Sequence, residues 1–245
     1  MGGVLRADLA LPSASSFDGV RPAAVRATGE SSLPQVKIYY DTSLEYARNT
    51  MPDAGLFYIG EARAQGELAA LCRRLSGNAP DKPPPLRALG PELDALEARL
   101  LAAYRPPASI DRHSDFIGAS SRLKEARELD AAGLEYGAML RYLQTVQAVA
   151  LLAPAAAPVA TEALPSRLAE LDRALSAPGV DHTIGRTFLE SAQAELDEKK
   201  AALERAPAIV TEVLPAYFAA LSPARPSPPR PPARVTVTLV RWPYT

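Results

Sequence analysis

Large apolar residues recur every three or four positions along most of the chain, which is the spacing of one face of an α-helix. The pattern is clearest over 54–75, and it also marks helices over 36–50, 91–104, 116–132, 135–152, 163–176, 183–205 and 207–221. The segment 135–152 is apolar on nearly every side, so we expect it at the centre of the fold. The pattern therefore predicts a mostly α chain, with about eight helices arranged in antiparallel hairpins.

Proline, glycine and aspartate mark the breaks between these helices. Met51-Pro52-Asp53 predicts a turn, since the residue before proline avoids the helical conformation and Asp53 is suited to cap the next helix. Asp181 is placed to cap the helix that begins at 183. Pro215 lies inside the last predicted helix, where we expect a kink or a restart.

Composition divides the chain into four segments. Residues 1–34 are rich in Gly, Ser, Ala and Pro and predict an irregular N-terminal arm, followed by a helical domain over 35–221. Small residues near 153–161 mark a possible boundary within that domain. A proline-rich linker over 222–233 and a strand over 234–245 complete the chain.

The C-terminal strand is the main candidate for binding a partner. Val235, Val237 and Leu239 alternate with Thr236, Thr238 and Val240, which is the period of a strand. A lone strand has unpaired backbone groups on both edges, so we expect it to pair with a partner protein or with another copy of the chain. Trp242 and Tyr244 would anchor it. The alternative is a strand that lies on its own helices.

A short fragment recurs on three of the predicted helices. Its copies are Tyr58-Ile-Gly-Glu-Ala62-Arg-Ala, Tyr142-Leu-Gln-Thr-Val146-Gln-Ala and Phe188-Leu-Glu-Ser-Ala192-Gln-Ala, and Ala54 and Ala138 precede the first two aromatic residues by one helical turn. This pattern resembles the second helix of a tetratricopeptide repeat. The resemblance implies stacked helical hairpins with a concave surface that binds peptides. The spacing between the copies is irregular, so the alternative is an irregular helical bundle. In either fold, Ala54, Tyr58 and Ala62 are expected to form a seam against the preceding helix.

Charge and composition exclude several classes of function. The 27 basic and 28 acidic residues nearly cancel, so the chain has no overall field to attract nucleic acid. No apolar run is long enough to predict a transmembrane segment. No signal peptide is visible, which favours a cytoplasmic protein, or an exported one if the start is misassigned. Cys72 is the only cysteine and is expected to be a buried, unreactive thiol.

The sequence predicts no catalytic, cofactor or metal site. His113 and His182 belong to no helical metal-binding motif, and no glycine-rich phosphate loop or nucleophile elbow occurs. Asp111, His113 and Asp115 lie close together, but Arg112 would oppose a cation. Polar strings of this kind commonly cap helices.

These observations favour a non-enzymatic scaffold or adaptor that holds protein partners. The C-terminal strand would be its attachment element, through residues Val235, Val237, Leu239, Trp242 and Tyr244. Two alternatives stay open, namely an all-α enzyme with an unrecognised site and a structural subunit of a homo-assembly joined by the terminal strand. Converging carboxylates in a pocket would favour the enzyme.

Overall fold

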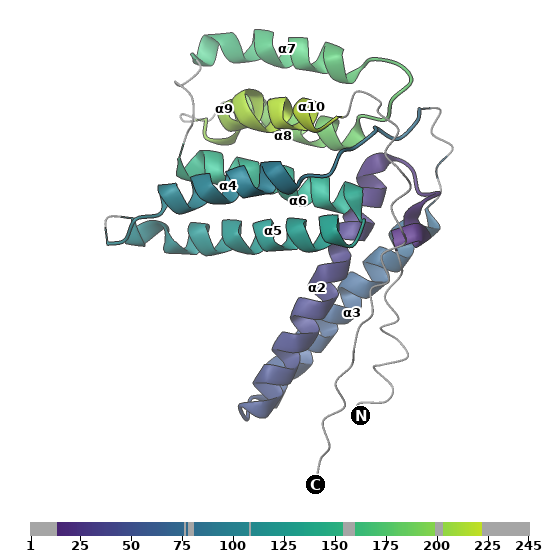
Figure 1. Ribbon diagram of the computed structural model, residues 1–245, viewed down its shortest axis with the longest axis vertical. Coiled ribbons are helices and arrows are strands. Elements are labelled where there is room, and N and C mark those ends of the chain that lie inside the picture. Colours follow the sequence, from purple (N-terminus) through teal and green to yellow (C-terminus); the bar gives the residue numbers. More distant parts are fainter. Residues whose placement is uncertain are drawn as a thin grey trace.

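The computed structural model describes residues 14–75, 77, 81–107, 109–153, 160–198 and 203–221. The described part is mostly helical, as the hydrophobic pattern predicts (Figure 1). Its α-helices are α2 (Ala23–Arg48), α3 (Pro52–Arg74), α4 (Gly90–Ala103), α5 (His113–Ala131), α6 (Glu135–Leu152), α7 (Leu164–Leu175), α8 (Thr183–Asp197), α9 (Arg205–Ala208) and α10 (Leu214–Ala220). Short 3-10 helices lie at η1 (Ala14–Phe17), η2 (Ile110–Arg112) and η3 (Thr161–Ala163), and η4 (Ile209–Val213) is π-helical.

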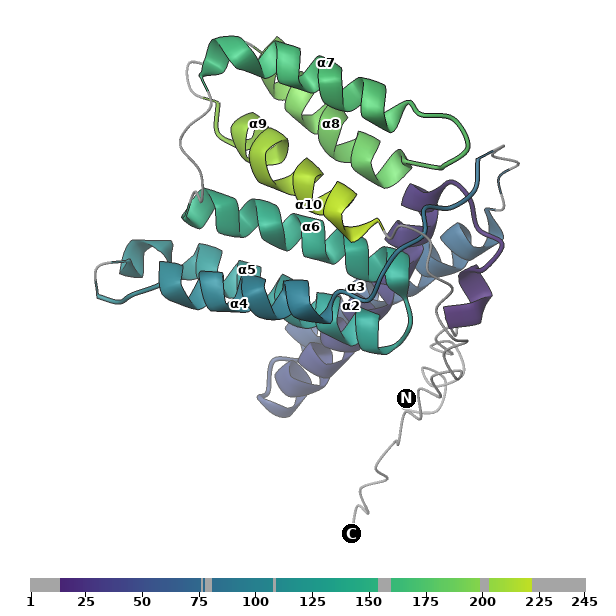
Figure 2. The same cartoon turned by 45° about the horizontal axis from the view of Figure 1, so that its top comes forward.

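The helices α4 to α10 form a layered body, and the hairpin of α2 and α3 projects from it (Figures 1 and 2). Helix α6 lies within the body and contacts α2, α4, α5 and the helix that runs through α9, η4 and α10. Met139, Leu143 and Val149 on α6 are fully buried. The prediction that 135–152 lies at the centre of the fold is confirmed.

The hairpin is held together by small residues at intervals of two helical turns. Gly29, Val36 and Ser43 on α2 and Gly55, Ala62 and Ala69 on α3 are all buried. A Cβ atom on Gly55 would lie 3.1 Å from the backbone oxygen of Ser43, so the two backbones approach closely. The seam predicted at Ala54, Tyr58 and Ala62 is confirmed at Ala62, which is buried, and at Tyr58, whose ring stacks on Tyr39 and Tyr46 of α2. Ala54 is partly buried.

Helix α2 begins at Ala23, well before the predicted start at 36. Residues 23–34 therefore belong to a helix, and the irregular arm predicted over 1–34 is wrong for this part. Proline usually ends a helix because it removes a backbone donor, yet Pro34 lies inside α2. Ala27 and Glu30, on the turns before Pro34, are buried.

The first turn of α2 is capped by residues far away in the sequence. The backbone N–H of Ala23 donates to Asp181 Oδ2 at 2.5 Å, and that of Ala24 donates to Thr183 Oγ1 at 2.8 Å. Asp181 Oδ1 also accepts from the backbone N–H of Thr183 at 3.0 Å, as expected for a cap of α8. One aspartate thus joins the start of the hairpin to the body.

The last helix runs without a break from Arg205 to Ala220, with a π-helical stretch over Ile209–Val213. This stretch directly precedes the turn that holds Pro215, whose ring would clash with the carbonyl one turn earlier in a regular α-helix. The kink or restart predicted at Pro215 is seen as a change of helix type, because the π-helical stretch ends at Val213 and α10 begins at Leu214 with Pro215 in its first turn. Helix α8 ends at Asp197, earlier than the predicted 205.

Candidate functional site

The residues predicted to bind a partner lie outside the described part of the chain. This applies to the linker over 222–233 and to the strand residues Val235, Val237, Leu239, Trp242 and Tyr244. In the described residues no extended strand occurs, and only two isolated bridges are present, Lys82 with Val180 and Leu86 with Leu221. The C-terminal strand therefore stays a prediction.

The polar string at 111–115 has partners of its own within the protein. Arg112 Nε pairs with Asp115 Oδ2 at 3.1 Å, and the Tyr104 hydroxyl lies 2.7 Å from His113 Nδ1. Among the described residues, no group of three or more His, Cys, Asp and Glu side chains is placed to hold a metal ion.

The remaining sequence candidates are buried. His182 Nδ1 lies 2.9 Å from the Tyr217 hydroxyl, and burial lowers the pKa of this histidine. Cys72 is buried in the hairpin seam, where burial raises the pKa of its thiol. The prediction that Cys72 is buried is confirmed.

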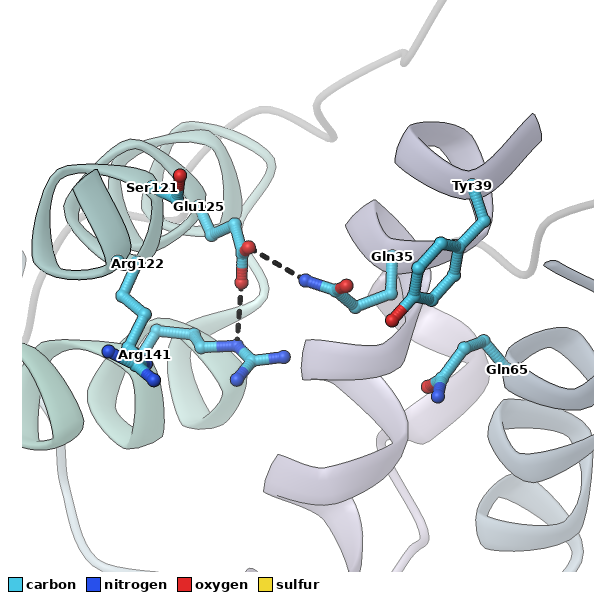
Figure 3. A pocket seen from close by; sticks show the side chains of 8 residues that line it. Gln35, Tyr39, Gln65, Ser121, Arg122, Glu125 and Arg141 are labelled. Carbon is cyan, nitrogen blue, oxygen red and sulfur yellow. Dashed lines mark hydrogen bonds and ion pairs between the residues drawn. The ribbon is translucent and has the colours of Figure 1, made fainter. Parts of the chain in front are cut away.

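A groove of about 400 Å³ lies in the corner between the hairpin and the body (Figure 3). It is open to solvent along one side. Its walls come from α2 and α3 on the hairpin and from α5 and α6 on the body. The lining residues are Gln35, Tyr39, Gln65, Gly118, Ser121, Arg122, Glu125 and Arg141.

Glu125 and Arg141 hold the wall of this groove in place. Glu125 is buried, and its Oε1 accepts a hydrogen bond from Gln35 Nε2 at 2.7 Å. Its Oε2 lies 2.9 Å from Arg141 Nε, so the two form an ion pair (Figure 3). Arg141 also donates to Gln144 Oε1 at 2.9 Å and to the backbone oxygen of Ser31 at 3.3 Å. These contacts link α5 and α6 to α2 and fix the corner.

Arg122 is the second cation of the groove and is exposed on α5. Gly118 lies one turn before it, and a Cβ atom there would be 3.5 Å from Arg122 Nη1. The guanidinium therefore lies along the helix next to the groove. Within the described part of the chain, Arg122 has no hydrogen-bond or ion-pair partner.

Aromatic side chains continue the groove along the hairpin. The ring centroids of Tyr39 and Tyr58 are 6.2 Å apart, and those of Tyr46 and Tyr58 are 5.2 Å apart, both pairs being stacked. Phe57 lies edge-on to Tyr58 at 5.4 Å and is 62% exposed. We call Tyr39, Tyr46 and Tyr58 the tyrosine ladder. Since Tyr39 also lines the groove, the groove and the ladder form one continuous surface.

The end of the hairpin carries further exposed apolar side chains. Met51 is 56% exposed and Leu56 is 64% exposed, and Leu44 is also exposed. The turn between the helices places Thr50 at a φ of 59°, in the left-handed region. These side chains leave apolar surface in contact with solvent at the end of the hairpin.

Sequence reasoning missed this surface, although part of its signal was present. Tyr39 and Tyr46 are seven residues apart, which places them on one face of any helix that contains both. Tyr58 was predicted to lie against the preceding helix, but no pattern linked it to Tyr39 and Tyr46. No sequence signal indicated that Arg122 and Glu125 would face α2.

No helix in the described ranges is long and apolar enough to span a membrane. Comparison with models of protein families, with curated proteins and with solved structures finds no match for this chain.

Proposed function

We propose that the protein is a non-enzymatic protein-interaction adaptor, and that it holds a segment of a partner in the groove and along the tyrosine ladder. The observation that carries this proposal is the concentration of exposed apolar side chains on one projecting element. Among the described residues, Ile38, Leu44, Met51, Leu56, Phe57, Leu71 and Leu75 lie on or next to the hairpin, whereas Leu101, Ile110, Ile117 and Leu151 lie on the body. Exposed aromatic and aliphatic groups of this kind provide most of the binding energy in protein interfaces.

The chemistry of the groove supports binding rather than catalysis. Its one carboxylate, Glu125, is paired with Gln35 and Arg141 and is not available as a general acid or base. The resemblance to tetratricopeptide repeats supports the same proposal, because such repeats bind peptides on a concave surface. The alternating pattern of Val235, Val237 and Leu239 supports a second attachment element at the C-terminus, for a partner or for another copy of the chain.

Affinity purification with the full chain tests the adaptor proposal. The double variant Tyr46→Ala/Tyr58→Ala removes two members of the ladder, and Arg167→Ala on exposed α7 serves as the matched control. Helix α7 lies at the opposite edge of the body from α5 (Figure 2). Proteins captured by the wild type should be lost with the ladder variant and retained with the control.

The ladder variant should have a lower thermal midpoint than the wild type, because Tyr46 and Tyr58 stack on each other across the contact of α2 with α3. Capture is therefore compared at a temperature at which circular dichroism shows both proteins to be folded. Equal capture by the wild type and a folded ladder variant would contradict the proposal. A chain lacking 234–245 tests the second attachment element separately. If that element acts independently, its deletion should remove a different set of partners from the one that depends on the ladder.

A further inference from the structure

We infer that the partner segment is acidic, with a carboxylate that pairs with Arg122 and neighbouring apolar residues that pack on the tyrosine ladder. This inference rests on the proposed function and specifies the chemistry of the partner. It combines two observations, a cation without a partner among the described residues and an exposed aromatic surface that adjoins it.

The charge balance of the groove favours an anion. Two guanidinium groups, those of Arg122 and Arg141, line it against a single carboxylate, that of Glu125. Since Glu125 pairs with Arg141, these two charges offset each other, and the positive charge of Arg122 stays uncompensated. A basic partner segment would meet this charge directly and be repelled.

The hydrogen-bonding groups of the Arg122 side chain are all donors. A guanidinium group has five N–H donors and no acceptor, and it binds a carboxylate through two parallel hydrogen bonds. The side chains of Tyr39, Gln65 and Ser121 line the same groove and can donate as well as accept hydrogen bonds, so Arg122 is the group that selects an acceptor. A carboxylate, which only accepts hydrogen bonds, complements this set.

The continuity between the groove and the ladder points to a polypeptide rather than a small free anion. An exposed ion pair alone contributes little to affinity because water and salt screen it. A segment that reaches from Arg122 past Tyr39 to Tyr46 and Tyr58 would also bury aromatic surface, which adds the larger share of the binding energy.

A nucleic acid would also bring anions and stacking bases, but the hairpin disfavours a polyanion. Exposed carboxylates such as Glu45 and Asp53 alternate with exposed cations such as Lys37 and Arg48 on the hairpin, so it carries no continuous row of positive charge. A phosphate at every nucleotide requires such a row. A peptide with one or two acidic residues does not require one.

Selection of random peptides displayed on phage, with the full-length protein as bait, tests the inference. Peptides selected by the wild type should share an Asp or Glu next to apolar or aromatic residues. A selected peptide, synthesised and measured by isothermal titration, should bind Arg122→Gln about twofold to fivefold more weakly than the wild type, and Arg122→Glu more weakly still, because this variant repels the carboxylate. Arg167→Glu on α7 is the matched control and should leave the affinity unchanged.

A charge exchange gives a readout that a merely structural role of Arg122 would not produce. Replacing the acidic residue of the selected peptide by Lys should weaken binding to the wild type and strengthen binding to Arg122→Glu. Peptides without an acidic residue that bind the ladder and tolerate both Arg122 variants would overturn this inference and leave the adaptor proposal intact.

Two further outcomes would overturn more than the acidic motif. If no selected peptide depends on Tyr46 or Tyr58, the inference and the adaptor proposal both fail. If a single-stranded oligonucleotide binds more tightly than every selected peptide and is lost in Arg122→Glu, the partner is a nucleic acid and the peptide inference is wrong.

Discussion

Three buried carboxylates of this protein accept hydrogen bonds from backbone N–H groups at the start of a helix. Glu30 accepts from Gly137 in the first turn of α6 at 2.7 Å, Asp181 accepts from Ala23, and Glu195 accepts from the start of α9. The first N–H groups of a helix have no partner within it and form the positive end of its dipole. Each carboxylate therefore stabilises a helix start that its own local sequence does not cap.

We predict that Glu195→Gln lowers the free energy of unfolding by about 1–2 kcal/mol at neutral pH. Glu195 accepts from the backbone N–H groups of Glu204 and Arg205 at 3.1 and 3.2 Å, and also from that of Ala206. Glutamine keeps an oxygen acceptor but loses the negative charge that these donors stabilise. Urea denaturation measures the change, with exposed Glu190→Gln on the same helix as the control.

The effect of Glu195→Gln should depend on pH. Burial alone would raise the pKa of Glu195, but the N–H groups of Ala206, Arg205 and Glu204 together hold it below its usual value. The stabilisation is therefore complete above the pKa of the unfolded chain, about 4.3, and is lost as the pH falls through the lower pKa of the folded protein. The difference between wild type and variant should shrink below about pH 4. A constant difference down to low pH would contradict this assignment.

At the scale of the elements, the same substitution should have opposite effects at two glycines. A Cβ atom on Gly137 would lie 2.7 Å from Glu30 Cβ and 3.0 Å from the backbone nitrogen of Ser31, so Gly137→Ala should force α6 away from α2. We expect a destabilisation of about 1–3 kcal/mol. Gly60 on α3 has open space around its Cβ position, and Gly60→Ala should stabilise the protein by about 0.5–1 kcal/mol.

Thermal and urea unfolding of the two variants check this contrast. Gly60→Ala is the matched control, because it also replaces a glycine inside a helix by alanine, at a position where the added Cβ atom meets no neighbour. If Gly137→Ala also raised the free energy of unfolding, helix propensity, rather than the close approach of α2 and α6, would decide the outcome at Gly137.

Some helices of this protein are encoded by a local pattern and others only by their neighbours in the fold. The helices at 135–152 and 54–75 were predicted within a few residues, since the spacing of their apolar residues is a local property. The start of α2 was missed because its buried face consists of small and polar residues such as Gly29, Glu30 and Ser31. These residues are recognisable as a packing face only when α6 is beside them.

At the scale of the whole molecule, the groove depends on where the hairpin meets the body. Gln35 and Glu125 are 90 residues apart in the sequence, and their 2.7 Å hydrogen bond exists only because α2 crosses α5 at this point. The sequence predicted hairpins and a surface between them, but no local pattern encodes this crossing. It also could not show that Glu125 neutralises Arg141 and leaves Arg122 available.

The division of the molecule into a body and a projecting hairpin predicts two levels of local stability. In α2 the buried residues concentrate between Ala23 and Val36, where the helix packs on the body, and Ser43 is the only buried residue beyond them in the described helix. The part of the hairpin over 38–60, which we call the outer hairpin, therefore buries little apolar surface and is held mainly by the contact of α2 with α3. Segments with few buried contacts open at a lower free energy than the core.

We therefore expect amide hydrogens over 38–60 to exchange faster than those over 24–36 and those of α6. Hydrogen exchange measured by mass spectrometry on the full chain checks this order. An acidic peptide that binds along Tyr46 and Tyr58 should slow exchange over 38–60 and leave α7 unchanged, since a ligand stabilises only the states to which it binds. Equal protection of the inner and outer hairpin without peptide would mean that α2 and α3 open only with the whole protein.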